Sequence, residues 1–152
     1  MIATAQSIED LSLNITEEIH VKAPIAVTFA ALLEELGPAF KNMEGQSMMA
    51  KIEPWPGGRW YRDLGDNNGH FWGVVQAIKK PTLLEIAGPL MMSFAVVNNV
   101  QYRLSEEAGG TLIKFHHKGF GHIQQDYRDG MPKGWAQIGE RTRARAEASA
   151  KK

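Results

Sequence analysis

A histidine on one predicted strand is the residue best suited to acid–base chemistry in this chain. Within residues 111–119, Ile113, Phe115 and His117 fall on one face, and the residues between them on the other face are basic. Because the basic face should meet water, His117 is expected to point toward the core or a cavity. An imidazole there, with an ordinary pKa near neutrality, could act as a general acid–base or anchor a ligand. The alternative is a core histidine that hydrogen-bonds to a neighbouring side chain or to water.

A metal site is not expected, although His116, His117 and His122 lie close together in the sequence. Adjacent residues of a strand point to opposite faces, so His116 and His117 do not share one ion without a bulge. The chain also has no cysteine and neither of the spacings H-x-H and H-E-x-x-H. We therefore expect neither a metal nor a cofactor.

One arginine is expected to face inward. Arg62 shares strand parity with Trp60, so both point toward the interior if Trp60 does. A buried guanidinium needs an anionic partner, which is either a nearby Asp or Glu or the carboxylate of a ligand. The alternative is that Arg62 extends its charged end to the mouth of a cavity.

Aromatic residues occur on several predicted strands and on the last helix, and a curved sheet would bring many of them to one interior. They are either the walls of a cavity with a few placed polar groups or ordinary core filling. The pairs Met48–Met49 and Met91–Met92 would suit a variable apolar pocket, with core or loop filling as the alternative. The pattern of residues 70–79 leaves open which face of that strand points inward. The predicted ligand-binding residues are Trp60, Arg62, Phe71, Tyr102, Phe115, His117, Trp135, Gln137 and Ile138.

The elements that must position these residues follow from hydrophobic periodicity and from turn residues. The expected strands are residues 13–21, 47–53, 59–64, 70–79, 82–87, 96–105 and 111–119. The expected helices are residues 24–36, a short helical or irregular piece at 40–44, and a final helix from about 125. Since hairpin-length loops join most consecutive strands, the sheet should be antiparallel. The expected fold class is α+β: a curved antiparallel sheet of about six to seven strands around a long C-terminal helix, with one or two short helices after the first strand.

The composition is that of one globular domain covering residues 1–152, with residues 1–11 as a flexible lead-in. The 152 residues include 17 basic and 17 acidic side chains, which gives no net charge to attract nucleic acid or an anionic membrane. The lack of cysteine suits a reducing compartment. With no signal peptide in residues 1–10 and no apolar run long enough to span a bilayer, we expect a cytoplasmic protein.

Several short motifs follow one another in order within residues 13–146. They are Val21-Lys22-Ala23-Pro24, residues 27–32, Pro56-Gly57-Gly58-Arg59-Trp60, Gly73-Val74-Val75, residues 80–83 and Gly134-Trp135. Together they resemble the START/birch-pollen-allergen-like (SRPBCC) superfamily, and within it the branch related to the activator of the heat-shock-protein ATPase. The resemblance implies a helix-grip fold with an internal apolar cavity. Gly139 stands where that family usually has a larger apolar residue, which predicts a roomier cavity here.

The resemblance implies a fold and leaves three kinds of function open. The first is binding of a small apolar or amphipathic molecule in a cavity between the sheet and the C-terminal helix. The second is a cyclase- or hydrolase-like enzyme with His117 as acid–base and Tyr102 or Arg62 stabilising negative charge. The third is a co-chaperone-type domain that binds a protein through its outer surface. We expect a small hydrophobic or amphipathic ligand, no nucleic acid and no membrane partner, and we leave a homodimer open.

Overall fold

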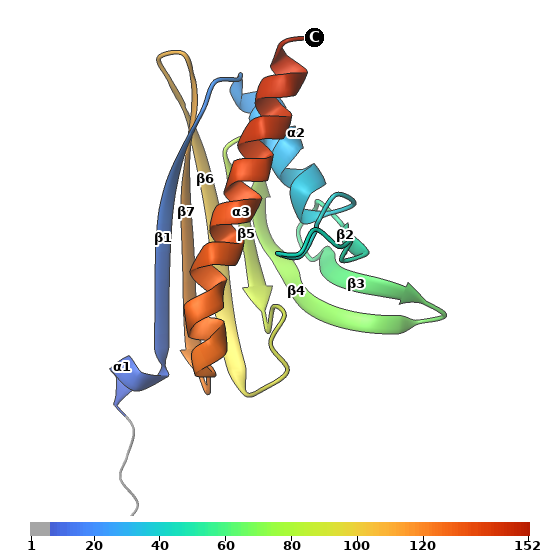
Figure 1. The fold of residues 1–152 in the computed structure, drawn as a ribbon, viewed down its shortest axis with the longest axis vertical. Coiled ribbons are helices and arrows are strands. Elements are labelled where there is room, and N and C mark those ends of the chain that lie inside the picture. The colour runs from blue at the N-terminus through green and yellow to red at the C-terminus, as the bar shows by residue number, and fades with distance from the viewer. Residues whose placement is uncertain (1–6) are drawn as a thin grey trace, which may run out of the picture.

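A curved antiparallel sheet of seven strands wraps around one long helix in the computed structural model, which describes residues 7–152 (Figure 1). The strands are β1 (Ser12–Val21), β2 (Ala50–Ile52), β3 (Arg59–Gly65), β4 (Asn68–Lys79), β5 (Leu83–Gly88), β6 (Val96–Glu107) and β7 (Gly110–Gly121). Their order in the sheet is β1-β7-β6-β5-β4-β3-β2, so β1 pairs with the last strand instead of the second. The helices are α1 (Ile8–Leu11), α2 (Ile25–Leu36) and α3 (Gln125–Ala150). The predicted α+β fold class is confirmed.

The segment before β1 is more regular than the sequence predicted. Ser7 is the N-cap of α1, and its hydroxyl accepts a hydrogen bond from the backbone N–H of Asp10 at 3.2 Å. The Asp10 carboxylate accepts the backbone N–H of Ser7 in return, which completes a capping box. Residues 8–11 thus form one capped helical turn, and residues 1–6 lie outside the described part of the chain, so a flexible lead-in stays a prediction.

The strand predicted at residues 47–53 is reduced to the short strand β2. Met49 has a φ of 51°, a left-handed conformation that interrupts an extended ladder. Just before it, the backbone N–H of Met48 donates to the Phe40 carbonyl at 2.9 Å. Residues 40–48 consequently form a loop that closes on itself between α2 and β2.

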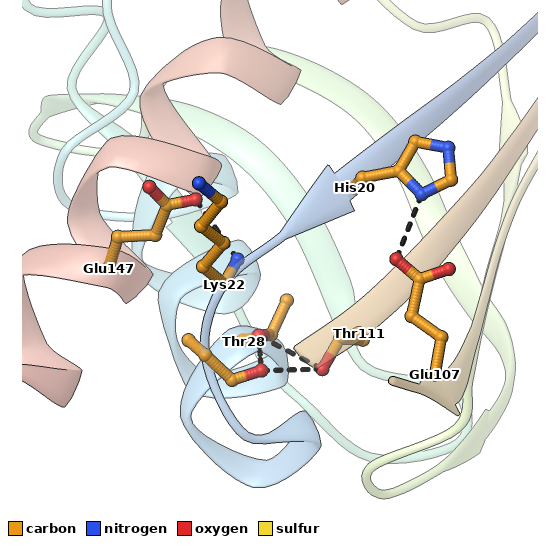
Figure 2. Close-up of polar contacts among 7 residues, drawn as sticks. His20, Lys22, Thr28, Glu107, Thr111 and Glu147 are labelled. Carbon is orange, nitrogen blue, oxygen red and sulfur yellow. Dashed lines mark hydrogen bonds and ion pairs between the residues drawn. The ribbon is translucent and has the colours of Figure 1, made fainter. Parts of the chain in front are cut away.

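Buried polar contacts fix the point at which the chain leaves β1 and enters α2 (Figure 2). Thr28 and Thr111 are completely buried, and their hydroxyls lie 3.4 Å apart. The Thr111 hydroxyl donates to the Ala23 carbonyl at 2.8 Å. From the other side of this junction, the backbone N–H of Lys22 donates to the Glu147 carboxylate of α3 at 3.0 Å. These contacts tie β7, α2 and the C-terminal half of α3 together at one end of the sheet.

Gly139 brings α3 close to β1 and does not enlarge the interior. A Cβ built on Gly139 would lie 2.6 Å from Glu17 Oε1 and 2.6 Å from Ile19 Cδ1. Both distances are shorter than van der Waals contact, so side chains of the strand already fill the space that a larger residue would use. The expectation of a roomier cavity at this position is wrong.

Trp60 joins the end of α2 to the sheet. Its indole N–H donates to the Leu36 carbonyl at 2.7 Å, and both residues are completely buried. The contact satisfies one of the carbonyls that a helix C-terminus leaves without a partner inside the helix. This hydrogen bond explains a tryptophan at the end of the Pro56–Trp60 motif without a ligand.

Candidate functional site

Aromatic rings fill much of the space between the sheet and α3. Tyr102, Phe115 and Trp135 form a row in which successive ring centroids are 4.9 and 4.8 Å apart. Each of these side chains is 3% exposed or less. Rings at these separations pack as a filled core, so this part of the interior is closed.

A second aromatic cluster lies under the end of α2. Its members are Phe40, Trp60 and Trp72, with ring centroids 5.2 to 5.9 Å apart. Of the rings in the two clusters, Phe40 and Trp135 border an opening at the edge of the core.

That opening is a pocket of about 490 Å³ between the first half of α3, residues 40–48 and the connection from β5 to β6. Its apolar lining consists of Phe40, Met43, Met48, Met91, Tyr127, Met131, Trp135 and Ile138. Its polar lining residues are Lys41, Asn42, Glu44, Asp126 and Gln137. The pocket is thus mostly apolar, with a few polar groups that could orient a ligand.

Two glycines are among the residues that α3 contributes to the wall. Gly130 and Gly134 line the pocket and are four residues apart, which places them on the same face of the helix. A Cβ built on either of them would meet nothing within 4 Å. The pocket is therefore open here because α3 lacks side chains at both positions.

The opposite wall is held in place by Arg141 of α3. Its guanidinium donates to the carbonyls of Lys41 at 3.1 Å and Asn42 at 3.4 Å. The side-chain oxygen of Asn42 accepts the backbone N–H of Gln46 at 2.9 Å, which closes the loop on itself. These contacts fix the loop against α3 without any ligand.

His117 is a completely buried histidine with both ring nitrogens engaged. Its Nδ1 accepts the indole N–H of Trp135 at 3.0 Å, and since an indole nitrogen only donates, Nε2 carries the proton. That N–H donates to Asn98 Oδ1 at 2.7 Å, and the Asn98 amide donates to the Gly88 carbonyl at 3.2 Å. Burial, together with the neighbouring His116, lowers the pKa of His117 to about 4. The neutral ring links α3 to the sheet and has no nitrogen free for proton transfer.

The predicted ligand-binding residues fall into separate environments. Three of the predicted residues line the pocket: Trp135, Gln137 and Ile138. The buried interior, away from the pocket, holds Trp60, Tyr102, Phe115 and His117. Arg62 is partly buried and does not line the pocket.

Phe71 is the clear error among the predicted wall residues. Trp60 pairs with Gly73 and Tyr61 with Phe71, so Trp72 is an extra residue in β4. Such a bulge shifts the alternation of a strand. Trp72 is 1% exposed, whereas Phe71 is 47% exposed. At this point of β4, Trp72 and not Phe71 therefore points inward.

Most of the pocket wall was not predicted from the sequence. Of the two methionine pairs, Met48 and Met91 line the pocket, whereas Met49 is 55% exposed and Met92 lies in the core. The lining residues that were not predicted are Phe40, Lys41, Asn42, Met43, Glu44, Asp126, Tyr127, Gly130, Met131 and Gly134. The available signal was the pair of glycines four residues apart in a predicted helix, since glycine is costly there without a packing or binding reason.

The sheet closed around a C-terminal helix defines a helix-grip protein of the SRPBCC superfamily. The chain belongs to the activator of Hsp90 ATPase homolog 1-like family, whose model matches residues 22–146. The branch predicted from the sequence motifs is confirmed. No curated protein matches the sequence of the chain.

Solved structures share this fold at low sequence identity. A protein from Mesorhizobium loti has a TM-score of 0.68 and 17% identity, over 89% of this chain and 97% of its own. A protein from Rhizobium leguminosarum has a TM-score of 0.67 and 20% identity, over 90% and 95% of the two chains. Ara h 8.0201 has a TM-score of 0.63 and 16% identity, over 90% and 99%. At these identities the likeness concerns the fold alone.

Two further properties concern residues 7–152. None of their helices combines the length and the apolar character needed to cross a membrane. They also bring together no group of three or more histidine, aspartate or glutamate side chains that could hold a metal ion.

Proposed function

We propose that the chain binds a small apolar or amphipathic molecule in the pocket between α3 and residues 40–48. The observation that carries this proposal is an open, mostly apolar space of about 490 Å³ whose α3 wall is bare at Gly130 and Gly134. Known small-molecule sites have volumes of roughly 300–1,000 Å³ and similar linings.

The side chains around the pocket support a site that accepts more than one ligand shape. Methionines come from three separate segments of the chain: Met43 and Met48 from the loop, Met91 from the β5–β6 connection and Met131 from α3. Methionine is unbranched and polarizable, so its side chain can adapt to different apolar surfaces. The rigid part of the wall is Trp135, whose ring is fixed by its hydrogen bond to His117.

The site lies at the edge of the interior that the sequence predicted as the cavity. The rings of Tyr102, Phe115 and Trp135 pack together in the centre of that interior, so we place the ligand at its edge. An enzyme that uses His117 as acid–base is disfavoured, because both nitrogens of that ring are engaged and buried. A co-chaperone-type role stays a prediction from the family resemblance.

Binding can be tested by fluorescence titration with N-phenyl-1-naphthylamine, a neutral apolar dye, on the protein and on Gly134→Leu. A leucine at residue 134 should occupy the open space and weaken binding by about tenfold or more, equivalent to about 1.4 kcal/mol. The matched control is Ala136→Leu, which adds a leucine to an exposed position of the same helix and should leave the dissociation constant unchanged. Equal dissociation constants for the protein and Gly134→Leu would show that the dye binds elsewhere, against the proposal.

A further inference from the structure

The apolar pocket does not account for the position of Arg62, which is not one of its lining residues. Its Nε is buried and has no hydrogen-bond partner within the described residues. Every other arginine of the chain contacts a carboxylate or a backbone carbonyl; these arginines are Arg59, Arg103, Arg128, Arg141, Arg143 and Arg145.

A carboxylate of the chain does not supply the missing partner. Across residues 7–152, no Asp or Glu forms an ion pair with Arg62. The acidic residue beside it in the sequence, Asp63, pairs with Lys51 at 2.7 Å on the other face of the sheet. Leaving a buried charged donor unpaired is unfavourable. An anionic partner for Arg62 would therefore have to come from outside the described residues.

Arg62 lies on the same face of the sheet as the buried Trp60. It follows Trp60 by two residues on β3, so the two side chains share a face. Its register partners are Ala50 on β2 and His70 on β4. Ala50 in turn follows the pocket-lining residue Met48 by two positions. Arg62 therefore pairs with a strand residue that is two positions from the pocket lining, and it does not itself line the pocket.

The partner of Arg62 on β4 adds a second hydrogen-bond donor. His70 Nδ1 accepts the indole N–H of Trp72 at 3.2 Å, so Nε2 of the neutral ring carries the proton. That nitrogen lies 3.5 Å from the hydroxyl oxygen of Ser93, two residues after the pocket-lining Met91. Because Nε2 is already protonated, His70 does not activate Ser93 as a nucleophile. The arrangement provides donors for recognition of an acceptor.

We infer that the molecule held in the pocket is an apolar anion and that Arg62 binds its anionic group. The inference rests on the proposed function and narrows its ligand class. An apolar body would occupy the methionine-lined pocket, and a carboxylate or sulfonate would pair with the planar guanidinium through charge-assisted hydrogen bonds. This placement gives the guanidinium an anionic partner and keeps the charge at the edge of the core.

Two dyes that differ by one sulfonate test the inference: anionic 8-anilinonaphthalene-1-sulfonate and neutral N-phenyl-1-naphthylamine. The test variant is Arg62→Met, which keeps a long apolar side chain and removes the charge. It should fold, because it deletes an unpaired donor, and its melting temperature provides the check. Lys133→Met is the matched control, since it removes one positive charge from an exposed position of α3 outside the pocket lining. Gly134→Leu reports on the pocket itself.

The expected result is that Arg62→Met weakens binding of the sulfonate dye by about tenfold and leaves binding of the neutral dye unchanged. Lys133→Met should leave the ratio of the two dissociation constants as it is in the unaltered protein. An unchanged ratio in Arg62→Met, or a loss of preference in Lys133→Met instead, overturns the assignment to Arg62. If Gly134→Leu still weakens the neutral dye in that case, the pocket function stands without the anionic group. If Gly134→Leu binds the neutral dye normally, the pocket function fails and the inference fails with it.

Discussion

Acid should destabilise the fold through His117, and the size of the effect follows from its burial. A histidine in an unfolded chain has a pKa near 6.5, whereas burial lowers the pKa of His117 to about 4. Between these values the unfolded state binds a proton that the folded state does not, so the unfolding free energy falls as the pH falls. The difference in pKa corresponds to roughly 3 kcal/mol lost between about pH 7 and about pH 4.

Urea unfolding followed by tryptophan fluorescence at a series of pH values measures this loss. The comparison variant is His117→Gln, whose amide can still accept from Trp135 and donate to Asn98 but does not titrate. Groups common to both proteins cancel in the difference between their unfolding free energies. We expect that difference to shrink by roughly 3 kcal/mol from about pH 7 to about pH 4. The same comparison with His122→Gln, a change at an exposed position, is the control. Parallel curves for the protein and His117→Gln would refute the reasoning.

Further substitutions test the packing, each by urea unfolding at neutral pH. Gly134→Ala should raise the unfolding free energy by about 0.5–1 kcal/mol, because it replaces a helical glycine that faces open space. Gly139→Ala brings the same gain in helix propensity, but its Cβ meets side chains of β1, so it should lower the unfolding free energy by about 1 kcal/mol. Equal changes in unfolding free energy for Gly134→Ala and Gly139→Ala would contradict the close approach of α3 to β1 at Gly139. Trp60→Phe should cost about 1–3 kcal/mol by leaving the Leu36 carbonyl buried and unpaired, and a neutral effect would contradict that role. Glu17→Gln should stabilise the fold, because burial raises the pKa of Glu17 above 4.5 and so disfavours its charged form; the gain should vanish in acid, and a constant gain would argue against this cause.

The strands and their faces could be predicted because their signal is local. Ile113, Phe115 and His117 are all buried, as the alternation in that strand predicted. The end of α2 at Leu36 agrees with the glycine and proline that follow it. These features depend on neighbouring residues along the chain, which is the scale at which periodicity and turn residues act.

The errors arise where distant segments meet. The bulge that turns Phe71 outward arises in the pairing of β3 with β4. Gly139 was interpreted as missing volume, but the sequence does not show that Ile19 of β1 occupies that volume. In both cases the outcome depends on contacts between elements, which propensity and periodicity do not contain.

The pocket was only partly predictable for the same reason. Trp135 and Ile138 were expected to face inward, since they follow the helical spacing of the apolar face of α3. Met43 and Phe40 come from an irregular loop whose position depends on Arg141, far along the chain. A glycine in a sequence also does not show whether the space beside it is empty, as at Gly134, or filled by another element, as at Gly139.

The most direct test of the pocket uses the methionine methyl groups as reporters. The chain contains seven methionines, so a spectrum with carbon-13-labelled methyl groups is simple enough to assign by substitution. On titration with N-phenyl-1-naphthylamine, we expect the resonances of the pocket methionines to shift together and to saturate; these are Met43, Met48, Met91 and Met131. The exposed Met49 and the core residue Met92 should stay unchanged. Shifts confined to Met92 would place the dye inside the core, and shifts confined to Met49 would place it on the outer surface, and either result would contradict a ligand site between α3 and residues 40–48.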